Sequence, residues 1–159
     1  MLSDYPPFLL AYVIISMVTP VVCWVWGGSP ERYGAGLALW IHLAFSYGAW
    51  KIEDVYVDST IEDALQAAAF GWLALRSNRW WPFVAAIACA FSLLIHLLTM
   101  VTDISWGAAV SARVGLGLLL YAGLMAGVLE RWLAGEIPAS RGKVWRRRAG
   151  PHEGRARGA

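Results

Sequence analysis

The chain has 159 residues, of which 58% are hydrophobic and only 15% are charged. Soluble domains are about 45–50% apolar and about 25% charged, and a soluble domain of this length could not bury so much apolar surface. Ten Trp, six Tyr and five Phe residues exclude a disordered chain. We therefore predict an all-α integral membrane protein that folds as a helical bundle.

The formal net charge of +2 is unevenly distributed along the chain. Seven of the thirteen Lys and Arg residues lie in residues 141–157, where Glu153 is the single acidic residue. Cytoplasmic segments collect Lys and Arg, and basic runs attract anionic lipid headgroups. We therefore predict a transmembrane helical domain over residues 1–137 and a disordered basic cytoplasmic tail over residues 138–159. A bacterial inner membrane is the expected location, and no nucleic acid is expected as a partner.

A bilayer core about 30 Å thick requires roughly 20 apolar residues in a helix. The first such run, residues 8–26, contains Pro20, which should kink it, and ends at Gly27 and Gly28. Because no basic segment or cleavage site precedes this run, we expect it to remain as a membrane anchor. The second run comprises residues 35–52.

Residues 61–76 form a doubtful segment after the second run. The apolar part of this segment is short and Ala-rich, and Gln66 lies beside it. Runs of this kind are more often interfacial or re-entrant than spanning. The polar residues before it can cap a helix, and Glu62 and Asp63 suit a first turn. We therefore predict a helix that lies on the cytoplasmic membrane surface or dips into it.

The last two apolar runs are residues 81–102 and residues 110–133. The chain has four spans if the doubtful segment stays at the surface, and five if that segment crosses. Either arrangement leaves one cation outside, Arg32 with four spans or Lys51 with five, so the positive-inside rule does not separate them. The length requirement favours four transmembrane helices plus a short interfacial or fifth helix.

Seven tryptophans lie near the ends of the predicted helices. They are Trp24, Trp26, Trp50, Trp80, Trp81, Trp106 and Trp132. Tryptophan gathers at membrane–water interfaces because its ring is apolar while its N–H is polar. We interpret these side chains as interfacial anchors.

Ionisable side chains inside a membrane are costly, and they are therefore the default candidates for a functional site. The candidates here are His42, His96, Asp103 and Arg113. Ser92, His96 and Asp103 recur at helical spacing and share one helix face. Such side chains can form interhelical hydrogen bonds whose role is only to hold the bundle together. Alternatively, the four candidates line a small polar site for a metal, a haem or an acidic ligand.

The number of spans decides whether the two intramembrane histidines can meet. With the spans given above, His42 and His96 share a depth only in the four-span arrangement. Five spans would separate them by about 11 Å along the membrane normal. Metal–nitrogen bonds are about 2 Å long, so joint ligation by these histidines requires four spans.

Gly123 and Gly127 form a GxxxG spacing in the last apolar run. Small residues at this spacing allow two helix backbones to approach closely. The pattern predicts helix packing at these glycines, either within the chain or between copies. Packing within the chain is the favoured interpretation for a multi-span protein.

The sequence contains no motif that identifies a reaction or a cofactor. It lacks a phosphate-binding loop and the HExxH, CxxC, CxxCH and GxSxG patterns. We therefore favour a non-enzymatic accessory, scaffold or assembly subunit, which acts through helix packing and its basic tail within a homo-oligomer or a larger membrane complex. One alternative is a ligand-, metal- or haem-binding bundle that uses His42 and His96, and another is a small holin-like pore.

Overall fold

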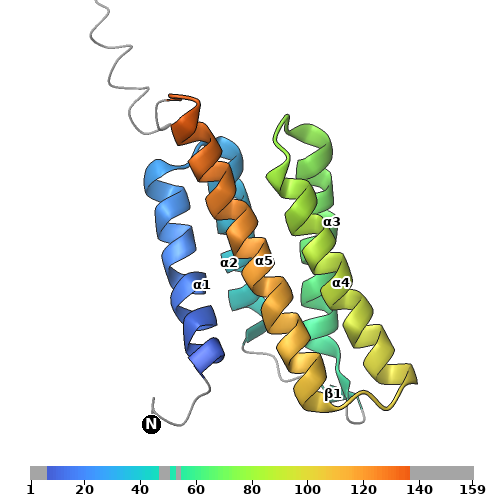
Figure 1. Ribbon diagram of the computed structural model, residues 1–159. Helices are drawn as coiled ribbons and strands as arrows, with labels where there is room; N and C mark the ends of the chain where they lie inside the picture. The colour runs from blue at the N-terminus through green and yellow to red at the C-terminus, as the bar shows by residue number, and fades with distance from the viewer. Residues whose placement is uncertain (1–6, 47–50, 53–54, 137–159) are drawn as a thin grey trace, which may run out of the picture.

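A computed structural model of the chain describes residues 7–46, 51–52 and 55–136. Five helices that run alternately up and down form a bundle (Figure 1). They are α1 (Pro7–Trp26), α2 (Ser29–Ser46), α3 (Val57–Arg76), α4 (Trp81–Val101) and α5 (Trp106–Leu133). The strands β1 (Lys51–Ile52) and β2 (Val55–Tyr56) pair antiparallel between α2 and α3, with Lys51 opposite Tyr56. The predicted helical bundle is confirmed, while the predicted tail, residues 138–159, lies outside the described residues.

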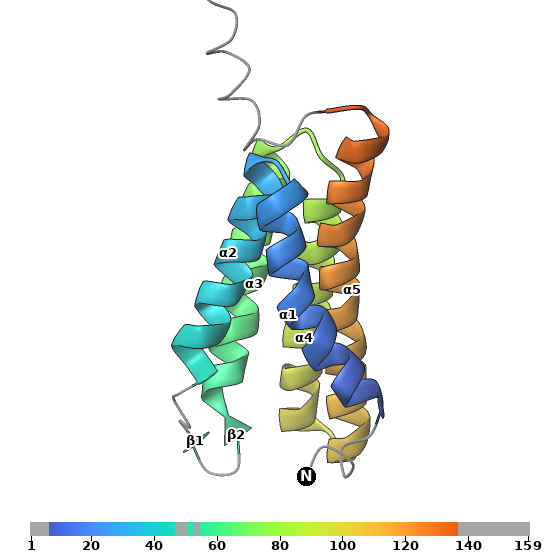
Figure 2. The ribbon, with the colours of Figure 1, turned by 90° about the vertical axis from the view of Figure 1, so that its left-hand side faces the viewer.

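The helices pack so that the two ends of the bundle carry different connections. α4 packs against α3 and α5, α2 packs against α3, and α1 packs against α5 and α2 (Figure 2). We call one end the C-terminal end; it holds the α1–α2 turn, the α3–α4 connection and the end of α5. The N-terminal end holds the start of α1, the β1–β2 pair and the α4–α5 connection.

Three helices of the described chain are long and apolar enough to cross a membrane. They are Phe8–Trp26, Trp81–Val101 and Gly107–Leu133. The prediction of four transmembrane helices is therefore not confirmed. The predicted second span, residues 35–52, is wrong in its limits, because α2 begins at Ser29 and ends at Ser46. α2 consequently includes Glu31 and Arg32, which reduce its mean hydropathy.

Local chemistry explains why α2 begins earlier than its apolar run. Pro30 lies in the first turn, where a backbone N–H is not needed for a helical hydrogen bond. The Gly28 N–H donates to Glu31 Oε2 at 2.8 Å, which is half of a capping box. These residues start a helix although they are too polar to be found from hydropathy.

The helix predicted over residues 61–76 is present, but it is longer than predicted. α3 has 20 residues and packs along α2 and α4 as a full member of the bundle. It begins at Val57, one turn earlier than predicted, and at 1.5 Å per residue it is about 30 Å long. Its outward face carries exposed apolar side chains such as Trp72 and Leu75, while Glu62 and Asp63 line a pocket in the interior.

Large apolar side chains cover the outside of the bundle. Exposed examples, one from each helix, are Ile14, Trp40, Leu75, Phe91 and Leu129. The interior is built largely from small residues such as Ala35, Ala85 and Ala88, and it encloses the fully buried Glu31. This distribution is the reverse of that in a soluble domain, and it is the one expected of helices surrounded by lipid.

Trp81 is the largest fully buried side chain and lies near the C-terminal end of the core. Its ring packs edge-on against Phe70, with centroids 6.3 Å apart, and its Nε1 donates to Glu31 Oε1 at 3.1 Å. Gly34 and Gly127 make room for this ring, because a Cβ at either position would lie 2.6 or 2.4 Å from it. The prediction that Trp81 is an interfacial anchor is therefore wrong.

The other tryptophans near helix ends differ from Trp81. Those with described side chains are all exposed, namely Trp24, Trp26, Trp80 and Trp132. Trp50 and the side chain of Trp106 lie outside the described part of the chain. The interfacial role of the exposed tryptophans stays a prediction.

Gly127→Ala should destabilise the bundle by about 1–3 kcal/mol, because overpacking a closed core forces side chains out of their preferred positions. The added methyl group would lie 2.4 Å from Cδ1 of the buried Trp81 ring. Thermal unfolding of the detergent-solubilised full chain measures the effect. Gly115→Ala is the matched control on the same helix, because a Cβ there meets no atom within 4 Å. Equal destabilisation by both variants would contradict this role for Gly127.

Candidate functional site

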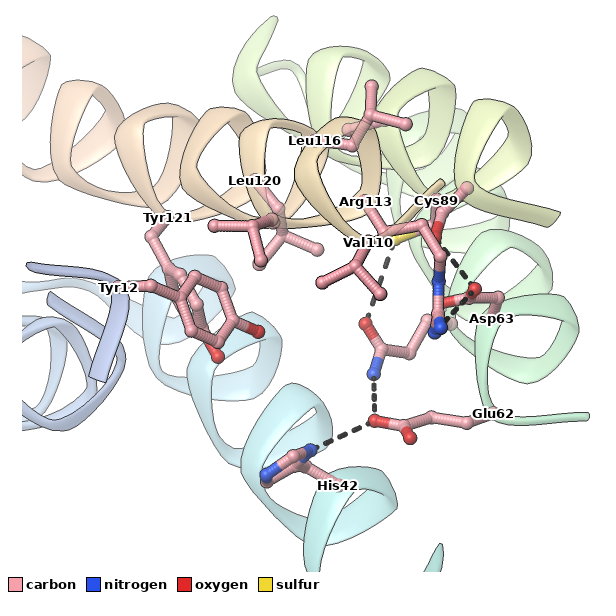
Figure 3. A pocket seen from close by; sticks show the side chains of 15 residues that line it. Tyr12, His42, Glu62, Asp63, Cys89, Val110, Arg113, Leu116, Leu120 and Tyr121 are labelled. Carbon is pink, nitrogen blue, oxygen red and sulfur yellow. Dashed lines mark hydrogen bonds and ion pairs between the residues drawn. The ribbon is translucent and has the colours of Figure 1, made fainter. Parts of the chain in front are cut away.

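A pocket of about 230 Å³ opens toward the N-terminal end of the bundle, with side chains from all five helices in its wall (Figure 3). We call it the polar pocket. Its polar lining residues are Tyr12, His42, Glu62, Asp63, Gln66, Cys89, Ser92, Arg113 and Tyr121. Its remaining lining residues are Ala88, Val110, Val114, Leu116, Gly117 and Leu120. A pocket in which every helix contributes depends on the whole bundle rather than on one local motif.

The first turns of α3 supply the acceptors at the centre of the polar pocket. Glu62, Asp63 and Gln66 lie within about one helical turn and share a face. Gln66 Nε2 donates to Glu62 Oε1 at 3.1 Å, and the same oxygen lies 3.1 Å from His42 Nδ1 on α2. Cys89 Sγ on α4 donates to Gln66 Oε1 at 3.7 Å. This chain of contacts joins α2, α3 and α4 (Figure 3).

One carboxylate oxygen of Asp63 contacts polar groups of both α4 and α5. Its Oδ2 accepts a hydrogen bond from Ser92 Oγ at 2.7 Å and lies 3.4 Å from Arg113 Nη2. Arg113 Nε also donates to Ser92 Oγ at 3.4 Å. His96 Nε2 lies 3.2 Å from the same Asp63 oxygen, although it lacks the alignment of a hydrogen bond. The carboxylate is thereby both charge-paired and hydrogen-bonded.

The two neighbouring carboxylates differ in how their charge is compensated. Asp63 faces the permanently charged guanidinium of Arg113. Glu62 faces His42, which is a cation only when its imidazole is protonated. The side chain of Glu62 is 17% exposed, so its carboxylate is reached from the polar pocket. With a neutral His42, Glu62 therefore gives the polar pocket a net negative charge.

Two tyrosines form the aromatic wall of the polar pocket. The rings of Tyr12 on α1 and Tyr121 on α5 have centroids 5.9 Å apart, tilted by 58°. Gly117 allows this approach, because a Cβ there would lie 2.7 Å from the Tyr12 ring. The wall presents ring faces and hydroxyl groups to anything that binds beside Glu62.

The structure brings together three of the four residues singled out from the sequence. His42 and Arg113 line the polar pocket, and His96 contacts Asp63 without lining it. Asp103 lies beyond the end of α4, is exposed and takes no part in the network. Of the predicted stripe on α4, Ser92 and His96 are buried against this network.

The two histidines lie toward the same end of the bundle, although the bundle has five helices. The expectation that this requires four spans depends on a second helix that ends at residue 52, whereas α2 ends at Ser46. That shift of six residues moves His42 by about 9 Å along the helix axis. The histidines contact different carboxylates, Glu62 and Asp63. Among the described residues, no group of three or more His, Cys, Asp or Glu side chains could hold a metal ion.

The acceptors on α3 and the tyrosine wall are not among the candidates found from the sequence. There, Glu62 and Asp63 only suit a first helical turn, and Gln66 only lies beside a short apolar stretch. A usable signal was present, because these three residues share one helix face while Ile61 and Leu65 lie elsewhere on the helix. In so apolar a chain, a helix with one acidic face and one apolar face turns its acidic face inward.

Comparisons with known proteins add no family to these observations. No family model matches the chain. Neither the curated proteins nor the solved structures include a significant match. The polar pocket is therefore the feature of the molecule that indicates a function.

Proposed function

We propose that this chain is a multi-span membrane protein that binds a small organic cation in the polar pocket. The observation that supports this proposal is an acidic network enclosed by five helices whose outward faces are apolar. Keeping ionisable groups inside such a bundle is costly, and proteins retain them mainly along ligand, ion or proton pathways. This proposal takes up the ligand-binding alternative, with Glu62 as the central residue and His42 as its partner.

The charge and shape of the polar pocket support a cation as the ligand. Asp63 is already paired with Arg113, whereas the charged partner that the described residues provide for Glu62 is the titratable His42. A ligand ammonium group beside Glu62 would complete the charge balance and donate hydrogen bonds. The rings of Tyr12 and Tyr121 add faces that attract cations.

The same arrangement supports five membrane crossings. α2 and α3 contain charged residues, but Glu31, Glu62 and Asp63 face the bundle interior, while Trp40 and Leu75 face outward. Each of these helices is about as long as a bilayer core is thick. Five crossings put the two ends of the bundle on opposite sides of the membrane.

The distribution of cations supports a cytoplasmic C-terminal end of the bundle. The cations at that end of the described bundle are Arg32, Arg76, Arg79 and Arg131, and the seven cations of residues 141–157 follow in the sequence. β1, at the opposite end, carries Lys51. Cytoplasmic segments are enriched in Lys and Arg.

The accessory or scaffold role remains a second proposal, with one restriction. The Trp81 ring of the same chain packs against Gly127. A Cβ on Gly123 would lie 3.6 Å from the Trp81 carbonyl oxygen. Contact between copies through this glycine pair would therefore displace α4. Haem ligation and pore formation gain no support from the geometry of the described residues.

A pair of matched aromatic ligands tests the proposed cation site. We expect 2-phenylethylamine to raise the unfolding temperature of the detergent-solubilised full chain by at least about 2 °C near saturation, because it binds the folded state. Phenylacetate, of similar size and opposite charge, should produce no increase. Differential scanning fluorimetry measures both.

Glu62→Gln should abolish the increase caused by the amine, because the substitution removes the charge and keeps the shape of the side chain. Asp103→Asn is the control, since it removes an exposed carboxylate outside the polar pocket. An increase retained in Glu62→Gln, an equal increase with phenylacetate, or no increase with the amine would each contradict the proposal.

Cysteine labelling tests the five crossings independently of any ligand. A membrane-impermeant thiol reagent should label Ser59→Cys and Ser77→Cys from opposite sides, because these positions lie at the two ends of α3. Asp103→Cys should be labelled from the same side as Ser59→Cys. The native Cys23 and Cys89 are buried, and the unsubstituted chain supplies the background. Labelling of positions 59 and 77 from one side would show that α3 does not cross.

A further inference from the structure

A groove of about 640 Å³ lies at the C-terminal end of the bundle, and none of its lining residues lines the polar pocket. It runs between α2 and α3 and reaches the α3–α4 connection. Arg76, Arg79 and Arg131 line one part of it, and Leu37, Trp72 and Leu73 line another. The groove is therefore amphipathic, with a cationic part at the end of the bundle and an apolar part along it.

The three arginines differ in their partners. Arg79 pairs with Glu130 and Glu136, and the Arg79 hydrogen bond holds the pKa of Glu136 below its usual range. Arg131 pairs with Glu136 at 3.3 Å. None of these carboxylates lines the groove, so the charged side chains of its wall are arginines.

Arg76 is the arginine with the most freedom to bind an anion. Its guanidinium stacks on the Trp72 ring at 5.3 Å from the centroid. It makes no ion pair with a carboxylate in the part of the chain that the structure describes. The N–H groups of a guanidinium that lies over an aromatic ring point outward in the guanidinium plane, where they can bind phosphate oxygens at two points.

We propose that this groove binds one anionic glycerophospholipid. The phosphodiester contacts Arg76 at the cationic part of the groove, and an acyl chain lies along Leu37, Trp72 and Leu73. Basic pockets between helices on the cytoplasmic side of membrane proteins bind anionic headgroups in this way. The apolar walls favour a lipid over a free phosphate, and the neighbouring Tyr33 and Leu75 are exposed on the lipid-facing surface.

Native mass spectrometry of the full chain with dioleoylphosphatidylglycerol tests this proposal. We expect saturable binding of one lipid, with dioleoylphosphatidylcholine binding more weakly. Arg76→Gln should weaken binding of phosphatidylglycerol about fivefold, which is typical of one cation near anionic headgroups. Arg76→Lys should retain part of the affinity, because the charge is kept while the two-point contact is lost.

Arg32→Gln is the matched control for Arg76→Gln. Arg32 also lies at the C-terminal end and stacks on a tryptophan, Trp24 at 5.9 Å, but it does not line this groove. The basic tail is present in every variant, so its contribution is constant. Equal weakening by both substitutions, equal binding of the two lipids, or displacement of the lipid by excess sn-glycerol 3-phosphate would each overturn the proposal. Loss of amine binding in the polar pocket would leave this result unaffected, because no residue lines both cavities.

Discussion

The fold depends on pairing buried charges across helices, and the carboxylate of Glu31 is the clearest case. Its two oxygens accept hydrogen bonds from the Gly28 N–H and the Trp81 indole, and Arg131 Nη1 lies 3.9 Å away. An unpaired carboxylate in an apolar interior costs several kcal/mol. The α1–α2 turn, α4 and α5 must therefore meet at this point. Trp81 then packs against Gly127 on α5, so one buried charge determines the arrangement of the C-terminal half.

The same constraint operates in the N-terminal half, where its result is a cavity instead of a closed core. Asp63 Oδ2 accepts a hydrogen bond from Ser92 and pairs with the permanently charged Arg113, which holds α3 against α4 and α5. Glu62, one residue before it, has a titratable partner in His42 and remains accessible from the polar pocket. Carboxylates that only stabilise packing are expected to be closed off from solvent, as Glu31 is. The accessible carboxylate is therefore the group that points to a ligand.

The extent of successful prediction differs between helices for a physical reason. α1 and α4 were located closely because each is an apolar run that ends at a glycine pair or begins at a proline. α2 and α3 were misplaced because part of each helix is polar. Hydropathy counts a polar residue against a span, although a polar residue such as Glu31 can face the interior of the bundle and leave the lipid-facing surface apolar. Trp81 was misinterpreted for the related reason that its position near a helix end does not reveal its neighbours.

The amino-acid sequence alone indicated that lipid surrounds this protein, that the protein is helical and that its C-terminal segment is basic. It also identified His42 and Arg113 as candidate site residues. These conclusions need only composition, periodicity and the cost of placing charge in lipid. The tertiary structure decided which groups meet: Glu62 with His42, and Asp63 with Arg113. Such pairs depend on where each helix starts and which neighbour it packs against. A shift of six residues in α2 moves a side chain by about 9 Å, which is enough to make or break any of these contacts.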